Sequence, residues 1–176
     1  MKIYHGSIEK VECPEIRESN RTLDYGQGFY TTTSYEQAEA WVKRRMNEKR
    51  TSHGYVCVYE LDENALQDLK SLIFEQPTEE WLDFVMKNRT QKGYVHEFDI
   101  VYGPVANDRV YAAFALYEGG LINKQALIAE LKAYKLVDQY LFHTATALKA
   151  LTFIEARRLS NESEYHATKS VFAPAI

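Results

Sequence analysis

Three short segments, far apart in the chain, carry residue types that could bind and act on a ligand. They are Tyr4-His5-Gly6-Ser7, Gly26-Gln27-Gly28-Phe29-Tyr30-Thr31-Thr32 and Asp138-Gln139-Tyr140-Leu141-Phe142-His143. Gly6 has no side chain, so backbone N–H and C=O groups there can approach a ligand closely. Gln139 offers an amide oxygen that accepts a hydrogen bond, but it is uncharged and cannot act as a general base. These residue types predict a site for a polar ligand in which residue 139 supplies neither an acid nor a base.

The order and content of these segments resemble the ADP-ribosyltransferases, in the branch that contains diphtheria toxin and the poly(ADP-ribose) polymerases. The triad of that branch is His, Tyr and Glu, and on the resemblance it reads His5, Tyr30 and Gln139 here. The branch commonly has a Gly-x-Gly-hydrophobic-Tyr pattern at the second position, which residues 26–30 match. The resemblance implies that the chain uses NAD as a substrate, with glutamine where the family has its catalytic glutamate.

On the same resemblance, four residues near the chain start would bind NAD as the cofactor-like substrate. His5 would bond a ribose hydroxyl, the backbone of Gly6 would bind the carboxamide of nicotinamide, and Ser7 would contact the adenosine side. Gly28, at the entry to the second segment, belongs to this binding set. Taken alone, a His-Gly-Ser segment is more typical of a plain turn, so the prediction depends on all three segments together.

The resemblance also implies a slot for a flat ring between two aromatic residues. The resemblance implies that Tyr30 stacks on one face of the nicotinamide ring and that Trp41, eleven positions later, covers the other face. Ala38 stands where the family has a serine that bonds the carboxamide, so one substrate contact would be missing. Aromatic residues at such spacing are more often core packing, but these three positions in register favour the slot.

The glutamine at the third position decides what chemistry to expect. In the family, the glutamate carboxylate bonds the ribose 2′-hydroxyl and offsets the positive charge that develops on the ribose. Gln139 can accept that hydrogen bond but cannot activate an acceptor hydroxyl. Asp138 should point to the opposite face of its strand, so it would not replace the glutamate. The sequence therefore predicts single-unit transfer without chain elongation.

Three classes of function stay open on the sequence. The first is a mono-ADP-ribosyltransferase that modifies a protein or a nucleic acid, as small bacterial toxins or effectors of the family do. The second is an NAD glycohydrolase, in which water is the acceptor. The third is a non-catalytic module that binds NAD or ADP-ribose. By analogy with toxin members, we expect a small antitoxin protein as a possible partner.

Composition favours one globular domain. The 176 residues carry a formal net charge of −4, which is not typical of a general nucleic-acid binder. Cys13 and Cys57 suggest no disulfide framework, so the expected compartment is the reducing cytoplasm. No apolar run suggests a signal region or a membrane span. Because His53, His96 and His166 lack metal-ligand spacing, we expect no metal.

Strand and helix patterns alternate along the chain and predict an α+β domain. The expected class is an ADP-ribosyltransferase-like split, mostly antiparallel β core with surrounding helices, over residues 1–160, followed by a polar C-terminal tail at 161–176. Ser34, with Gln37 at the capping-box position, Thr78 and Asn123 are the expected helix N-caps. The expected strands span 2–4, 28–32, 54–61, 70–74, 98–102, 138–143 and 151–154. The expected helices span 36–48, 78–89, 108–117 and 124–132, with a helical turn from 144.

Overall fold

The computed structural model describes residues 1–18, 23–105, 108–133 and 136–160, so the expected tail at 161–176 lies outside the described residues. The strands in the described part are β1 (Lys2–Ser7), β2 (Phe29–Thr32), β3 (His53–Leu61), β4 (Ser71–Ile73), β5 (Ile100–Pro104), β6 (Asp138–Phe142) and β7 (Leu151–Ser160). The helices there are α1 (Tyr35–Lys49), α2 (Ala65–Asp68), α3 (Glu79–Thr90), α4 (Asp108–Glu118), α5 (Lys124–Ala133) and α6 (Ala145–Leu148).

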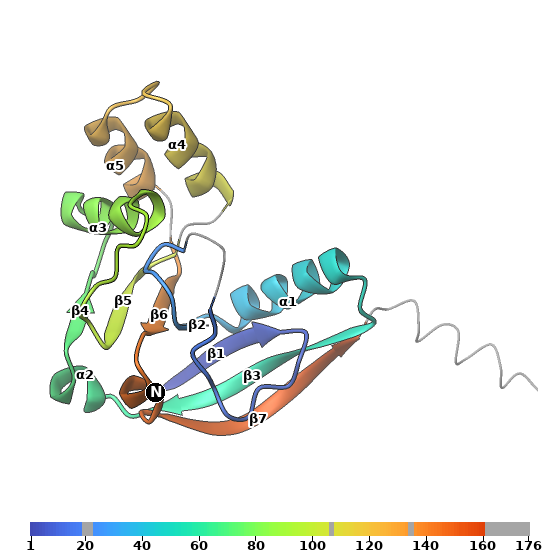
Figure 1. The fold of residues 1–176 in the computed structure, drawn as a ribbon. Helices are drawn as coiled ribbons and strands as arrows, with labels where there is room; N and C mark the ends of the chain where they lie inside the picture. The colour runs from blue at the N-terminus through green and yellow to red at the C-terminus, as the bar shows by residue number, and fades with distance from the viewer. Residues whose placement is uncertain (19–22, 106–107, 134–135, 161–176) are drawn as a thin grey trace, which may run out of the picture.

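All of these strands join one sheet in the order β4-β5-β6-β2-β1-β3-β7 (Figure 1). Every neighbouring pair is antiparallel except β4 and β5, which confirms the α+β, mostly antiparallel fold class. β1 pairs with β3 from Lys2 to Ser7, but its register with β2 is limited to Tyr4 opposite Thr32. The sheet is thus divided into a β6 half (β4, β5, β6 and β2) and a β1 half (β1, β3 and β7).

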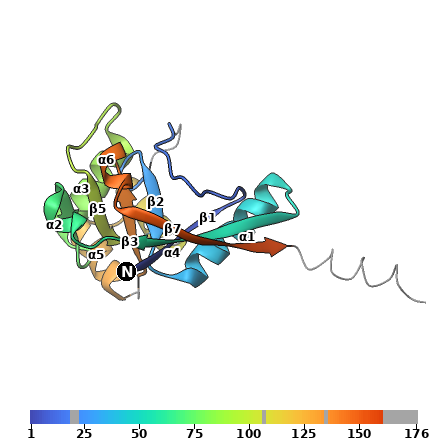
Figure 2. The same ribbon diagram turned by 90° about the horizontal axis from the view of Figure 1, so that it is seen from below.

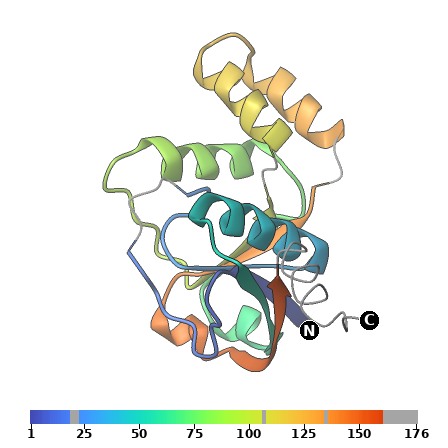
Figure 3. The same cartoon turned by 90° about the vertical axis from the view of Figure 1, so that its right-hand side faces the viewer.

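The helices cover the two halves unequally. α1 packs on the β1 half, where Ala38, Val42 and Met46 are buried against Val56. α3, α4 and α5 gather beyond the β6 half, over a separate core cluster that contains Trp81. In Figure 3, α1 (teal) lies nearest the strands, α3 (green) lies beyond it, and α4 with α5 (yellow and orange) lies farthest out. The cluster under α1 and the cluster under α3, α4 and α5 are separate, whereas a third cluster, which includes Ile3, Phe29 and Phe142, joins strands of both halves.

The largest differences from the expected elements concern β1, β7 and α2. β1 continues through Ser7, because its last residues keep pairing with β3. β7 runs to Ser160 rather than ending at 154, and it lies beside β3 along its length (Figure 2). The exposed Glu155, Arg157 and Arg158 gave that segment a polar pattern, which suits an edge strand with a solvated face. The short helix α2 was not expected.

The expected N-caps are confirmed, but the capping box is not complete. The Oγ of Ser34 accepts from the N–H of Gln37 at 3.2 Å, and Thr78 and Asn123 cap α3 and α5 in the same way. The N–H of Ser34 donates to Oγ1 of Thr32 at 3.1 Å. The hydroxyl of Thr32 donates in turn to Oε1 of Gln37 at 3.0 Å. The side chain of Gln37 therefore ties α1 to β2 rather than closing back on Ser34.

Candidate functional site

A cavity of about 700 Å³ opens where β1 and β2 separate, and we call it the split cavity. This volume is within the usual range for small-molecule sites, about 300–1,000 Å³. Its lining comes from β1, β2, α1, β6 and the loops that flank them. All seven residues of the expected site line it: His5, Gly6, Ser7, Gly28, Tyr30, Trp41 and Gln139. The structure therefore brings them together, whereas the role of each stays a prediction.

The backbone of Gly6 faces the opening between β1 and β2. Met1 and Leu61 exchange two backbone hydrogen bonds, N to O at 3.0 Å and 2.8 Å, which makes them a hydrogen-bonded pair across β1 and β3. Hydrogen-bonding direction alternates along an antiparallel strand, so His5 bonds toward β3 while Tyr4 and Gly6 are directed toward β2. Since the β2 register does not extend beyond Tyr4, the N–H and C=O of Gly6 point toward the split cavity.

The ring of His5 occupies the position where the β1–β2 ladder would continue. Its Nδ1 lies 2.7 Å from the carbonyl oxygen of Tyr30. A carbonyl only accepts, so Nδ1 carries the hydrogen. Burial lowers the pKa of His5, although the bond to Tyr30 opposes that change, so Nε2 is an unprotonated acceptor at neutral pH. The ring of Phe29 packs on the imidazole, with centroids 4.4 Å apart.

Side-chain alternation places His5 and Tyr30 on opposite faces of the sheet. Tyr4 stands opposite Thr32, so Tyr30 shares a face with Tyr4 and Thr32, whereas His5 lies on the other face. Both nevertheless line the split cavity. The two side chains therefore do not share a face of the sheet, and they meet only at the opening between β1 and β2 where the cavity lies.

The glycine at position 6 also has a packing reason. A Cβ there would lie 2.5 Å from the carbonyl oxygen of Ala38 and 3.2 Å from Cδ1 of Trp41. α1 can therefore lie on β1 only because residue 6 has no side chain. The absence of a Cβ serves packing and an accessible backbone together, so it does not by itself indicate a ligand.

Trp41 lies at the edge of the split cavity. Its side chain is 43% exposed and belongs to none of the buried core clusters. The guanidinium of Arg44 lies 5.8 Å from the centre of its ring. Ala38, one turn earlier on α1, is buried and also lines the cavity. An exposed indole at a concave surface is available to stack on a flat ligand.

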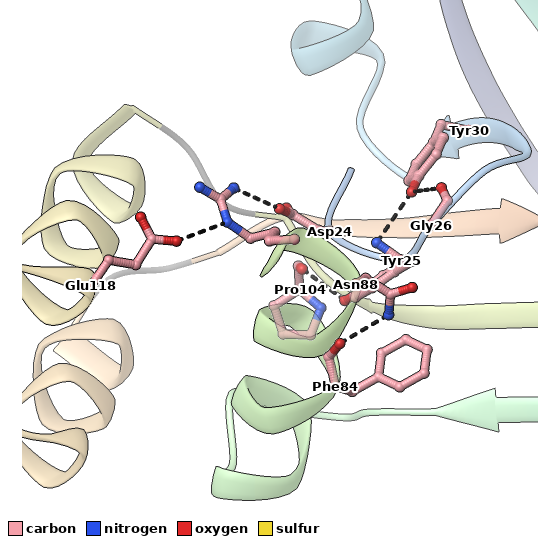
Figure 4. Close-up of polar contacts among 9 residues, drawn as sticks. Asp24, Tyr25, Gly26, Tyr30, Phe84, Asn88, Pro104 and Glu118 are labelled. Atoms are coloured by element: carbon pink, nitrogen blue, oxygen red, sulfur yellow. Dashed lines mark hydrogen bonds and ion pairs between the residues drawn. The ribbon is translucent and has the colours of Figure 1, made fainter. Parts of the chain in front are cut away.

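Tyr30 is held by the loop that precedes it. Its hydroxyl accepts from the N–H of Tyr25 at 3.1 Å and donates to the carbonyl oxygen of Gly26 at 2.6 Å (Figure 4). Gly26 has φ of +83°, which few other residues adopt readily. At Gly28, φ is +151° and a Cβ would lie 2.5 Å from the carbonyl oxygen of Phe142. Both glycines of the Gly-x-Gly pattern are therefore required by the backbone path that places Tyr30.

Gln139 comes to the cavity from β6. It stands opposite Thr32 of β2 and Gly103 of β5, and its side chain is buried. Asp138 leaves on the other face, where its Oδ2 accepts from the hydroxyl of Tyr102 at 2.7 Å. Ser7, which also lines the cavity, accepts the N–H of Glu9 with its Oγ at 3.1 Å.

Several lining residues carry no local sequence signal. The carboxyl of Asp24 is 7% exposed, and its Oδ1 lies 3.2 Å from Nη1 of Arg89 on α3. Burial raises the pKa of Asp24, and the Arg89 guanidinium opposes that rise. Nε of Arg89 also lies 3.6 Å from Glu118 at the end of α4 (Figure 4). Other polar or charged lining residues outside the three segments include Arg17, Gln37, Arg44 and Arg45.

Within the described ranges, no three His, Cys, Asp or Glu side chains gather so that they could hold a metal ion. No helix of the described part has both the length and the apolar content to cross a bilayer.

Comparison with known proteins gives a family and no named relative. No curated protein and no solved structure matches the chain. Residues 1–153 match the family described as protein of unknown function, DUF3990. That match extends from β1 into β7 and includes every residue of the expected site. The chain therefore belongs to the DUF3990 family.

Proposed function

We propose that this protein is an NAD-dependent mono-ADP-ribosyltransferase of the bacterial toxin or effector type, acting in the cytoplasm on a protein or a nucleic acid. The observation that carries the proposal is the arrangement of the split cavity. The backbone of Gly6 faces the opening, the rings of Tyr30 and Trp41 line it, and the amide of Gln139 enters it from β6. This combination suits a carboxamide, a flat ring and a ribose in sequence.

The reaction breaks the bond between ribose C1′ and the nitrogen of nicotinamide. The bonding electrons leave with neutral nicotinamide, and the ribose carries the positive charge of an oxocarbenium-like transition state. A nucleophilic atom of the acceptor then bonds C1′ and loses its proton to solvent. Gly6 would hold the carboxamide by its N–H and C=O, and Nε2 of His5 would accept a ribose hydroxyl.

Gln139 would act without charge. Its amide oxygen can accept the ribose 2′-hydroxyl, but it neither offsets the developing cation as a carboxylate does nor removes a proton from an acceptor. Transfer would therefore stop after one unit. A small antitoxin protein that covers the cavity would fit this class, by analogy alone.

The uncharged third position also favours two other outcomes of NAD binding. Water can replace the macromolecular acceptor, which makes the protein an NAD glycohydrolase. Alternatively, the protein binds NAD or ADP-ribose without cleavage. Both share the cavity and differ from transfer only after the ligand is bound.

The test is incubation with NAD that carries a label on its adenosine side, with and without cell lysate. Transfer predicts nicotinamide release together with label on one class of macromolecule, in single mass increments. Release without lysate identifies the glycohydrolase, and binding without release identifies the non-catalytic module. If calorimetry detects no binding of NAD or nicotinamide, the proposal is wrong.

Tyr30→Ala supplies the site-specific variant. Loss of one stacking face should weaken nicotinamide binding about tenfold. Tyr94→Ala is the matched control, because Tyr94 stacks under Lys87, with the ammonium 4.3 Å from its ring centre, and does not line the cavity. Equal affinities for nicotinamide in folded Tyr30→Ala and in the unmodified protein would show that Tyr30 does not form a stacking slot.

A further inference from the structure

The hydroxyl of Tyr25 has a fixed hydrogen-bonding pattern in the core of the β6 half. Tyr25 is completely buried. Its hydroxyl donates to the carbonyl oxygen of Pro104 at 2.9 Å (Figure 4). It accepts from Nε1 of Trp81 at 2.8 Å. Burial raises the pKa of Tyr25, so the hydroxyl keeps its proton at neutral pH. The hydroxyl oxygen still has one lone pair, which can accept a hydrogen bond from one more donor.

That lone pair is available beside Gln139. Gly103 stands directly opposite Gln139 in the β5–β6 ladder. A Cβ built on Gly103 would lie 2.5 Å from the Tyr25 hydroxyl oxygen. Directly opposed residues on one face have Cβ atoms about 4.5–5.5 Å apart. The Tyr25 hydroxyl therefore lies over the glycine that faces Gln139, on the same face of the sheet as the Gln139 side chain.

We propose that Tyr25 is a positioning residue for Gln139. The side-chain NH2 of Gln139 donates to the Tyr25 hydroxyl oxygen, so the amide oxygen is turned into the split cavity. The hydroxyl proton of Tyr25 is already donated to the carbonyl oxygen of Pro104, so the hydroxyl cannot donate to a second acceptor. A glutamate carboxylate at this position would compete with Pro104 for one proton, whereas an amide adds a proton of its own. The buried tyrosine thus selects glutamine at position 139.

The orientation of the amide does not depend on any activity, whereas its chemical consequence rests on the proposed function. With its oxygen facing the ligand, Gln139 is a fixed neutral acceptor for a ribose hydroxyl. Without Tyr25, the amide is free to present its NH2 instead. Loss of the Tyr25 hydroxyl should then slow nicotinamide release without changing the affinity for nicotinamide, since the ring is held by other residues.

The orientation is tested by NMR on the side-chain NH2 of Gln139, assigned by its disappearance in Gln139→Met. In the unmodified protein, its protons should exchange with solvent more slowly than those of the exposed Gln91, on the order of tenfold. In Tyr25→Phe, the Gln139 protons should exchange severalfold faster and their shifts should change. Exchange as fast as that of Gln91 in the unmodified protein would overturn the proposal without any variant.

Tyr102→Phe is the matched control. Tyr102 lies on the same strand pair, but its hydroxyl bonds Asp138 on the opposite face of the sheet. Removing it should leave the Gln139 signals unchanged. Equal responses to Tyr25→Phe and Tyr102→Phe would mean a general loosening of the sheet and would contradict a specific role for Tyr25. These measurements use no NAD, so their failure and that of the proposed function are separate results.

Discussion

The two sides of the split cavity are built in different ways. On the β1 half, the lining is backbone and exposed ring: Gly6 turns its peptide groups toward the opening, and Trp41 stands 43% exposed beside it. On the β6 half, the lining is supported by buried polar pairs. Tyr25 bonds Pro104 and Trp81, and Asp24 pairs with Arg89. One side depends on local chain geometry and the other depends on contacts between distant elements.

This difference implies that the two halves contribute differently to the proposed site. On the proposed function, Gly6 and Trp41 of the β1 half, together with Tyr30 of β2, would recognise a carboxamide and a flat ring, which needs exposure and close backbone approach. The β6 half presents one amide whose orientation must be fixed, and a buried hydrogen-bond network can fix it. Variants should therefore fail differently: those of the ligand-facing Gly6, Trp41 and Tyr30 in binding, and those of the buried polar pairs in the β6 half in stability and rate.

The largest effect is expected from Arg89→Leu in the β6 half. It leaves the buried carboxyl of Asp24 without its ion-pair partner, at a cost of about 3 kcal/mol in unfolding free energy. This loss of unfolding free energy should be smaller at about pH 5 than at about pH 7. Without Arg89, nothing opposes the rise in the pKa of Asp24 that burial causes. A carboxyl with a raised folded-state pKa contributes stability at low pH, and that contribution is lost as pH rises. Denaturant unfolding measures both quantities.

Lys43→Ala is the control for this ion pair. Lys43 forms an exposed i,i+4 pair with Glu39 on α1, and such pairs contribute about 0.5 kcal/mol or less. If Arg89→Leu were no more destabilised than Lys43→Ala, Asp24 would not depend on Arg89, and the contrast between the halves would lose its main support.

Two glycine substitutions compare the halves directly. Gly6→Ala and Gly103→Ala each place a Cβ 2.5 Å from a neighbour, the carbonyl oxygen of Ala38 or the hydroxyl of Tyr25. Each should cost about 1–3 kcal/mol through overpacking. Gly6→Ala should also weaken nicotinamide binding, whereas Gly103→Ala should keep that affinity and disturb Gln139. Calorimetry on the folded variants checks this, and equal losses of affinity would contradict the different contributions of the two halves.

Tyr30→Phe separates the ring from its hydroxyl. The phenyl ring can still stack, but the bonds to Tyr25 and Gly26 are lost. We expect a loss of about 1–2 kcal/mol in stability with a much smaller change in nicotinamide affinity than Tyr30→Ala causes. A variant as weak in binding as Tyr30→Ala would show that the loop contacts, rather than the ring, set the affinity.

The pH dependence of folding stability should involve two histidines, His5 on β1 and His96 in the segment that precedes β5. Burial lowers the pKa of His5 and of His96, whose ordinary value is 6.5. The folded chain then binds fewer protons than the unfolded chain, so this stability is present above about pH 6.5 and is lost as pH falls. His5→Gln and His96→Gln should each reduce the fall in melting temperature from about pH 7.5 to about pH 5.5. Unchanged slopes in both variants would exclude the two histidines as its cause.

The sequence predicted the cavity residues that stand in short motifs better than the buried pairs that support them. Gly6, Tyr30 and Trp41 stand in short motifs, and the caps of the major helices follow local hydrogen-bonding preferences. Asp24 and Arg89 are 65 positions apart and meet only in the folded chain, so no local pattern indicates them. The long β7 was underestimated for a related reason: its polar residues look irregular until β3 supplies a partner.

A titration with nicotinamide, followed by NMR on backbone amides, tests directly whether the split cavity is an NAD site. The split cavity should bind the carboxamide at Gly6, so the Gly6 N–H should shift among the most strongly in the chain, with the indole signal of Trp41 moving in parallel. Both responses should be lost in Tyr30→Ala. If nicotinamide binds while Gly6 and Trp41 keep their positions, or if it does not bind at all, the account of the cavity as an NAD site is contradicted.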